Sequence, residues 1–340
     1  MSKAADSYRG LGWAHGALTV QRLGAMLAPI TFVVEGGRQV SPMHVAPWAG
    51  KPGTEELPGI LRRLRGDWSC APFGYAVPVA DASAAWAPLL GEPEPGEELH
   101  GHSSNVDWTW MDTGDGSLAL GLDYPAGSPI VRTERRIRPD PDHPAVDIEF
   151  TIEVREACRI PIGLHPTFRL PRQAQAARIE PARFVEGRTY PGTVEPAGPL
   201  FAIDQGFSDL AAVPLRKGGG AFDATRVPFV DDSEELLQLN GIDGRCSLAN
   251  RAEGYRVTLS WDKAHFPSLL LWFSNRGRRF APFDGTHVAL GIEPICSPFG
   301  LGPATARADN PVARSGTPTA RAFAAGEIFT TRYRIAAEAI

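Results

Sequence analysis

Residues 145–154, with the sequence AVDIEFTIEV, alternate between apolar and mostly polar side chains. The apolar members recur at every second position: Val146, Ile148, Phe150, Ile152 and Val154. A period of two is the period of a β-strand, in which successive side chains point to opposite faces of a sheet. We therefore predict a strand here with one buried face and one face in water.

Similar runs of strand-forming residues occur along the rest of the chain, at 117–122, 255–261, 268–274, 287–292 and 328–335. Turn-forming segments such as DTGDG, PDPDHP, NRAEG and FDGT separate them, and 36 glycines and 31 prolines are spread over the whole length. A parallel α/β arrangement would need amphipathic helices of about ten or more residues between the strands. The best helix candidate is LPGILRRLRG at 57–66. The sequence therefore predicts an all-β, antiparallel protein.

The size of the chain is compatible with one large domain. All-β sandwiches often exceed about 200 residues as a single unit, and this chain has 340 residues, of which 43% are hydrophobic and 21% charged. We find no internal repeat and no linker with a shift in composition. We therefore expect one domain over 1–340, with residues 1–15 as a loose N-terminal arm.

Charge and segment composition argue against several classes of partner. The formal net charge is -5 and the arginines are scattered, so no positive field attracts a phosphate backbone, and we expect no nucleic-acid partner. No stretch of about 18 apolar residues is present to span a membrane, and the first residues do not resemble a signal peptide. We expect a cytoplasmic protein without a membrane partner, as a monomer or homodimer.

The four cysteines lie far apart in the sequence: Cys70, Cys158, Cys246 and Cys296. Without a closely spaced pair they indicate neither a zinc knuckle nor a disulfide framework. We interpret them as buried thiols.

The first candidate functional segment is GEELHGHSSNVDWTW, residues 96–110, which contains His100 and His102. On a strand, residues two apart share a face. Binding of a metal by these histidines would need a third ligand such as Asp107 or His165, and no fixed spacing supplies it. Two surface or hydrogen-bonded histidines explain the segment better than a metal site does, so we predict no metal site.

Two further segments each place an ionisable residue at the end of an apolar run and before a proline. His165 precedes Pro166, which holds the residue before it extended, and an imidazole with a near-neutral pKa can donate and accept a proton. Glu293 follows the run VALGI and precedes Pro294, where partial desolvation would raise the pKa of its carboxyl group. A structural histidine and a salt-bridged glutamate are the alternatives.

Three aromatic residues earlier in the chain are further candidates: Trp48, Trp68 and Phe73. Aromatic faces stack on the CH faces of sugars, and they also fill hydrophobic cores. We retain all three as candidate ligand contacts beside the core interpretation.

Taken in order, these segments resemble the galactose mutarotase (aldose 1-epimerase) superfamily. The family's LHG segment is matched by Leu99 to Gly101, its second histidine segment by His165 to Phe168, and its glutamate before proline by IEP at 292–294. The stretch ITFVVEGGRQVSPMHVAPW also resembles the family's first hairpin, so the resemblance runs from about residue 30 to 335. It implies a large, twisted antiparallel β-sandwich.

The resemblance also implies an activity, the interconversion of the α and β anomers of a sugar. In that reaction Glu293 removes the proton from the C1 hydroxyl group and His165 protonates the ring oxygen, while His100 and His102 help to hold the sugar. Neither a metal nor another cofactor is implied, and the expected partner is a small carbohydrate.

The sequence departs from the family in the region that grips the sugar hydroxyls. The family's Asn-Arg pair is replaced by LRGDWSCAPFG, where Arg65 or Asp67 would have to substitute, and the mid-chain aspartate finds a candidate only in Asp243. The second histidine is followed by PTF instead of the family's more usual aromatic and asparagine pattern.

These departures keep two alternatives open. One is a carbohydrate-binding or sensor protein of the same fold without turnover. Another is a hexose-6-phosphate 1-epimerase, in which Arg62, Arg63 and Arg65 would grip the phosphate, although the same segment also fits a short helix with a basic, solvated face. A polysaccharide lyase is disfavoured, because we find no Tyr and Arg pair beside the histidines.

Overall fold

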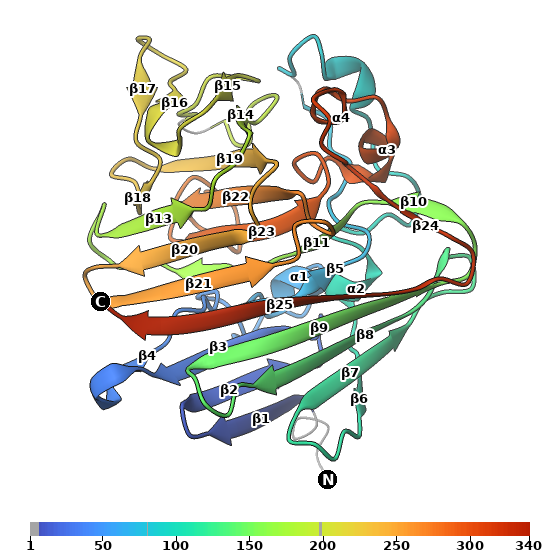
Figure 1. Cartoon of the computed structure of the whole chain (residues 1–340). Coiled ribbons are helices and arrows are strands. Elements are labelled where there is room, and N and C mark those ends of the chain that lie inside the picture. Colours follow the sequence, from blue (N-terminus) through green and yellow to red (C-terminus); the bar gives the residue numbers. More distant parts are fainter. Residues whose placement is uncertain (1–6, 80, 197–198) are drawn as a thin grey trace.

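The computed structural model describes residues 7–79, 81–196 and 199–340. Figure 1 shows two large sheets, with a smaller sheet at the lower left and short helices both at the upper right and near the centre behind the strands. Every pairing between the named strands is antiparallel. The prediction of an all-β antiparallel sandwich is confirmed.

One large sheet has nine strands. In spatial order they are β18 (Arg226–Val227), β13 (Ala177–Pro181), β20 (Arg245–Asn250), β21 (Tyr255–Trp261), β25 (Ile328–Ala339), β9 (Ala145–Val154), β8 (Ile130–Pro139), β7 (Leu118–Asp123) and β6 (Thr109–Met111). β9 is the strand predicted over 145–154, and its five alternating apolar residues are all buried.

The second large sheet has eight strands. Its order is β15 (Gly206–Phe207), β14 (Glu186–Thr189), β19 (Ser233–Asn240), β22 (Ser268–Asn275), β23 (Val288–Cys296), β11 (Ile162–Leu164) and β5 (Ser69–Cys70), with β12 (Thr167–Arg169) also paired to β23. This sheet carries the residues of the candidate site.

Smaller elements complete the fold. A four-stranded sheet contains β1 (Tyr8–Trp13), β2 (Gly16–Gln21), β3 (Leu27–Val33) and β4 (Gln39–Val40). Two strand pairs join β10 (Cys158–Ile160) to β24 (Arg321–Phe323) and β16 (Val213–Pro214) to β17 (Ala221–Phe222). The helices are short: α1 (Gly59–Arg62), α2 (His102–Asn105), α3 (Gly302–Arg307) and α4 (Pro311–Arg314), with 3₁₀ turns η1 (Glu35–Gly37), η2 (Ala87–Leu89) and η3 (Leu210–Ala212).

The N-terminus and the candidate helix differ from the sequence-based expectations. Residues 8–13 are not part of a loose arm, because they form β1 and pair with β2; residues 1–6 lie outside the described part of the chain. The helix expected within 57–66 is a single turn, α1, because the backbone leaves the helical region at Arg63 and pairs as an isolated bridge at Arg65 and Asp67.

Two other expectations concern thiols and membrane spans. All four cysteines are free, and three of them are buried, whereas Cys158 is only half-buried. Among the described residues, none of the helices has the length and hydropathy that a membrane crossing requires.

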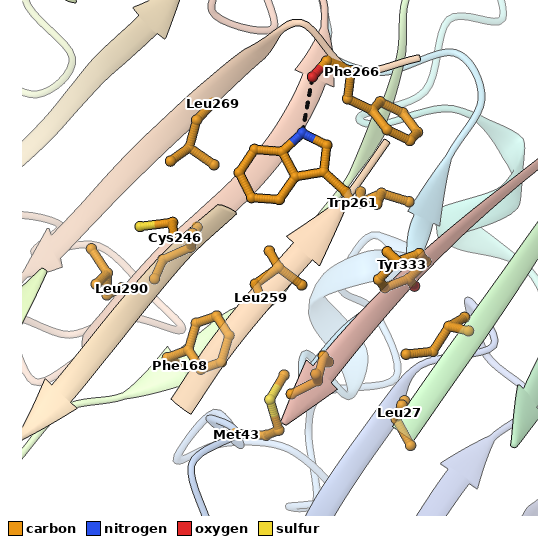
Figure 2. Close-up of a cluster of buried hydrophobic side chains, with 14 of the residues drawn as sticks. Leu27, Met43, Phe168, Cys246, Leu259, Trp261, Phe266, Leu269, Leu290 and Tyr333 are labelled. Carbon is orange, nitrogen blue, oxygen red and sulfur yellow. Dashed lines mark hydrogen bonds between the residues drawn. The ribbon is translucent and has the colours of Figure 1, made fainter. Parts of the chain in front are cut away.

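The main core lies between the two large sheets. Figure 2 shows part of it, with Leu259 and Trp261 from β21 beside Leu269 from β22 and Leu290 from β23. The indole N–H of Trp261 is a polar group within this cluster, and it donates a hydrogen bond of 2.9 Å to the carbonyl oxygen of Phe266. A buried tryptophan therefore keeps its polar atom satisfied.

The eight-stranded sheet is buried on both of its faces. Along β22, Leu269, Leu271 and Phe273 belong to the core between the sheets, whereas Leu270 and Trp272 belong to a second apolar cluster. Because side chains alternate across a strand, this second cluster covers the opposite, outer face of the sheet. The outer face forms the floor of the candidate site.

A buried ionic network connects the three principal sheets. Arg135 of β8 and Asp67, which precedes β5, form an ion pair in which both side chains are 0% exposed. Tyr333 of β25 accepts a hydrogen bond of 2.6 Å from Arg135 and donates one of 2.7 Å to Asp67. The backbone of Asp67 pairs with Leu27 of β3, so this one residue links the nine-stranded and four-stranded sheets to the segment that leads into β5.

Replacing Arg135 with methionine would leave the Asp67 carboxylate buried without its cation. We expect the free energy of unfolding to fall by about 3–5 kcal/mol, measured by denaturant unfolding. The matched control is Arg332→Met, which removes an ion pair between the exposed Arg332 and Glu149 and should cost about 1 kcal/mol or less. Equal losses in the two variants would show that the buried pair contributes no more than a surface pair.

Candidate active site

Glu293 lies inside β23, and its side chain points to the outer face of the eight-stranded sheet. Its neighbour Ile292 belongs to the core between the sheets, so the alternation of the strand turns Glu293 the other way, beside Leu270 of β22. The sequence placed Glu293 just after a strand; instead the strand continues to Cys296, and the glutamate is 1% exposed. Its carboxyl group is therefore buried more deeply than predicted.

Gly291 provides the space for this carboxyl group. A Cβ atom at Gly291 would lie 2.1 Å from Oε1 of Glu293 and 3.0 Å from Cβ of Trp272. Any larger residue would have to displace the carboxylate or the indole. Glycine inside a strand often marks such a close approach, and here it makes room for a side chain two residues further on.

His165 follows β11 directly and faces Glu293. Its Nε2 lies 3.5 Å from Oε1 of Glu293, and its backbone N–H donates a hydrogen bond of 2.8 Å to the carbonyl oxygen of Trp68. The indole ring of Trp68 stacks on the imidazole, with ring centroids 4.0 Å apart and planes 16° from parallel. The backbone and one aromatic face thus fix the orientation of the imidazole.

Burial moves the pKa values of this pair in opposite directions. Desolvation raises the pKa of Glu293 well above its usual 4.5, and the positive charge of Arg278 opposes the rise. Desolvation also lowers the pKa of His165 well below its usual 6.5, and His100 adds to this effect. His165 therefore does not have the near-neutral pKa predicted from the sequence, whereas the predicted rise for Glu293 agrees with the structure. Strongly shifted pKa values in a cleft are typical of functional groups.

His100 approaches the pair from a tight turn. Its φ is 56°, and the following Gly101 has a φ of 75°. A Cβ at Gly101 would lie 2.7 Å from the carbonyl oxygen of Pro72, so only glycine fits. Nδ1 of His100 accepts a hydrogen bond of 3.2 Å from the backbone N–H of Gly74. Because Nδ1 is the acceptor, Nε2 carries the proton and is a hydrogen-bond donor.

Desolvation lowers the pKa of His100 to about 3, and the charge of Arg278 contributes to the lowering. The imidazole is therefore a neutral donor throughout the neutral range. Its ring stands edge-on to that of His165, with centroids 4.9 Å apart. The two histidines and Glu293 thus lie in one cleft.

This cleft has a volume of about 340 Å³ and is lined by Trp68, His100, His165, Arg278 and Glu293 among others. Two of its buried polar atoms have no hydrogen-bond partner in the described part of the chain: the indole nitrogen of Trp68 and Oε1 of Glu293. One is a donor and the other is an acceptor. Buried polar groups are normally paired, so these two atoms are free to bind a ligand.

Arg278 is a cleft residue that sequence reasoning missed. Its Nε lies 3.2 Å from Glu195 and 3.3 Å from Glu234, and its guanidinium lies over the ring of Trp272 at 5.5 Å. Glu234 also accepts hydrogen bonds from the indole nitrogen of Trp272 at 2.6 Å and from the Ser274 hydroxyl at 3.1 Å. The only signal in the sequence was the basic run NRGRR directly after the strand SLLLWFS.

A buried histidine pair beside the cleft was also missed. Nε2 of His44 lies 2.9 Å from Nε2 of His287, and Nδ1 of His287 lies 2.8 Å from the Ser274 hydroxyl. His287 stacks on Trp272, with ring centroids 5.7 Å apart. Burial lowers the pKa of both histidines, that of His44 to about 4. The pair supports Trp272 from behind and does not line the cleft.

Several residues singled out in the sequence lie away from the cleft. Trp48 donates a hydrogen bond of 2.7 Å to the carbonyl oxygen of Leu61 and packs against Phe283. Arg65 lies over the ring of Tyr8 at 5.4 Å. Neither lines the cleft.

Phe73 and His102 take positions behind the site. Phe73 is 0% exposed and packs against His100 at 4.6 Å, filling the space beside Gly163. His102 does not share a strand face with His100, because the turn at Gly101 leads into α2; its Nδ1 pairs with Glu98 at 3.2 Å.

The arginines considered for phosphate binding and the candidate for the mid-chain aspartate also lie outside the cleft. Arg62 donates to the carbonyl oxygen of Leu57, Arg63 donates to the Tyr8 hydroxyl, and neither lines the cleft. Asp243 pairs with Lys263 and Arg183 at the surface. Within the described ranges there is also no group of three or more His, Cys, Asp and Glu side chains placed to hold a metal ion.

The sequence matches no protein-family model and no curated protein. Solved structures do match the fold along almost the entire chain. An Escherichia coli K12 protein provisionally named aldose 1-epimerase is 16% identical with a TM-score of 0.64, and the alignment covers 98% of this chain and 99% of that one. An aldose epimerase homologue from C. elegans is 12% identical, with a TM-score of 0.62 and coverage of 98% and 99%. A galactose mutarotase related enzyme from Lactobacillus acidophilus is also 12% identical, with a TM-score of 0.57 and coverage of 98% and 97%. The chain therefore has the galactose mutarotase-like fold.

Proposed function

We propose that this protein is an aldose 1-epimerase-like enzyme that interconverts the anomers of a sugar by opening and closing its ring. The observation that carries the proposal is the buried contact of 3.5 Å between His165 and Glu293 in a cleft of sugar-like size. The reaction needs one acid and one base on the same hemiacetal, and this pair supplies both. The fold shared with mutarotase-like proteins supports the same reading.

The proposed reaction begins with Glu293 ionised and His165 protonated. The carboxylate of Glu293 takes the proton from the C1 hydroxyl group, the carbonyl bond forms at C1, and the bond from C1 to the ring oxygen breaks. The imidazolium of His165 gives its proton to that ring oxygen. Rotation about the C1–C2 bond and the reverse steps produce the other anomer, and each group finishes in its starting protonation state.

Burial favours the neutral arrangement of the pair, with the proton on Glu293. The proposed first step needs the proton on His165 instead, and the contact of 3.5 Å provides the path for that transfer without solvent. Neutral His100 donates through Nε2 to the ring oxygen or a neighbouring hydroxyl group, and the unpartnered indole N–H of Trp68 offers a second donor. These groups orient the substrate before the proton moves.

A carbohydrate-binding protein without turnover is the second candidate function. The observation that favours it is the position of Arg65 outside the cleft, which leaves the family's Asn-Arg pair without a counterpart from the LRGDWSCAPFG segment. Such a protein would bind a sugar saturably and would leave its rate of equilibration at the buffer value.

Replacing Glu293 with glutamine keeps the shape of the side chain and removes its ability to accept the proton. We expect kcat for the equilibration of fresh α-glucose or α-galactose to fall by about 10²- to 10⁴-fold, measured by polarimetry or NMR. The control is Glu253→Gln, which removes a surface ion pair with Arg169 and should leave kcat unchanged. Equal activity of Glu293→Gln and the wild type would exclude Glu293 as the base.

The pH profile of the wild type tests the shifted pKa values. The pair takes up a second proton only below the lowered pKa of His165 and loses its one proton only above the raised pKa of Glu293. We therefore expect kcat, corrected for buffer catalysis, to stay level as the pH falls from about 7 to about 6, with the acid limb below the ordinary histidine pKa of about 6.5. A limb centred on that ordinary value would show that His165 titrates as an exposed histidine does.

A further inference from the structure

Much of the cleft is lined by aliphatic side chains that are only half-buried. They are Leu61, Val77, Val79, Leu99, Val194 and Leu236. Each of these side chains packs against the second apolar cluster and keeps part of its carbon surface exposed. An exposed apolar surface that is continuous with a functional cleft indicates a ligand with an apolar part.

The strand register shows how this apolar surface continues from the reactive pair. Glu293 of β23 lies opposite Leu270 of β22, and Gly291 lies opposite Trp272, which in turn lies opposite Leu236 of β19. The floor of the cleft therefore changes from the carboxyl group on β23 to leucine and tryptophan side chains on β22 and β19.

One polar side chain beside this floor already has hydrogen-bond partners within the protein. Gln238 lies opposite Leu270 and would be the natural partner for a sugar hydroxyl group. Its amide nitrogen donates to Asn240 at 2.8 Å and its amide oxygen accepts from the backbone of Phe299 at 2.6 Å. Both ends of the Gln238 amide are therefore already hydrogen-bonded within the protein.

The side walls are mostly apolar and closely packed, although Tyr75, Tyr190 and Thr193 also line the cleft. A Cβ added to Gly192 would lie 2.1 Å from a methyl carbon of Val79, so the loop that carries Val79 rests directly on the segment before Val194. Arg278 at the rim is flanked by two carboxylates, Glu195 and Glu234, so its charge is already balanced and does not select an anionic sugar.

A sugar hydroxyl group placed against the aliphatic part of this lining would fit poorly. A hydroxyl group held against Leu236 or Val79 loses its water and gains no hydrogen bond, which is unfavourable. A methyl or methylene group in the same place is buried favourably. The unpartnered polar atoms of Trp68 and Glu293 would still serve the polar edge that contains C1.

We propose that the substrate is a reducing sugar in which an apolar group replaces at least one hydroxyl or hydroxymethyl oxygen beyond C1, as in a deoxy or alkyl-substituted aldose. This inference rests on the proposed epimerase function, because that function places C1 at Glu293. The aliphatic lining, with Leu236 in its floor, then selects the apolar group.

The test compares D-glucose and D-galactose with their 3-, 4- and 6-deoxy analogues, by NMR-detected equilibration with the wild-type protein. We expect at least one deoxy analogue to exceed its parent in kcat/KM by about 10- to 200-fold, the range that one apolar group supplies in a hydrophobic pocket. Leu236→Asn should bring that ratio close to one. The control Val230→Asn, at an exposed valine outside the cleft, should leave the ratio unchanged.

The same sugars are titrated against Glu293→Gln by calorimetry, so that failure of the inference and failure of the proposed function can be distinguished. Acceleration of the parent sugars at a rate equal to or above all deoxy analogues overturns the inference and leaves the epimerase function standing. If no sugar is accelerated but a deoxy analogue binds more tightly than its parent sugar, and Leu236→Asn removes that preference, the result supports the apolar selection and contradicts the epimerase function. No preference in rate or in binding overturns the inference.

Discussion

The buried contact of Asp67 with Arg135 and Tyr333 is the interaction on which the arrangement of the sheets depends. Its members come from β8, β25 and the segment before β5, and the Asp67 backbone pairs with β3. Two charges inside a core are costly unless each is closely paired, so the network is favourable only when all these strands are in place. Trp68 follows Asp67 directly, and the position of its indole against His165 is therefore tied to the closure of the sandwich.

The candidate site lies on the outer face of the eight-stranded sheet, whose inner face packs into the core between the two large sheets. A carboxyl group and an imidazole placed there are surrounded by tryptophan, leucine and glycine instead of water, which is why the pKa values of Glu293 and His165 shift towards the neutral forms. The same surroundings keep His100 uncharged as a donor. At the rim, the charge of Arg278 is paired with two glutamates, Glu195 and Glu234.

Local patterns in the sequence predicted the all-β antiparallel class, the family resemblance predicted the fold, and both pointed to the centre of the candidate site. Alternation over 145–154 predicted β9, and an ionisable residue after an apolar run and before proline identified His165 and Glu293. Residues positioned by long-range pairing were not accessible in this way. Arg278 reaches the cleft only because β22 pairs with β19 and brings Glu234 beside it. The expectation that His100 and His102 share one face of a strand was wrong, because the left-handed turn at Gly101 lies between them and leads into α2.

The alternation along β23 also has a consequence for folding errors. Leu290 and Ile292 enter the core between the sheets, whereas Gly291 and Glu293 face the cleft. If the strand slipped by one residue, every side chain would change face, and the carboxyl group would enter the aliphatic core while two large aliphatic side chains filled the cleft. Burial of an unpaired carboxylate there would be strongly unfavourable. A mispaired strand would therefore yield an unstable chain, so the buried carboxyl group of the candidate site also disfavours a wrong register of the sheet.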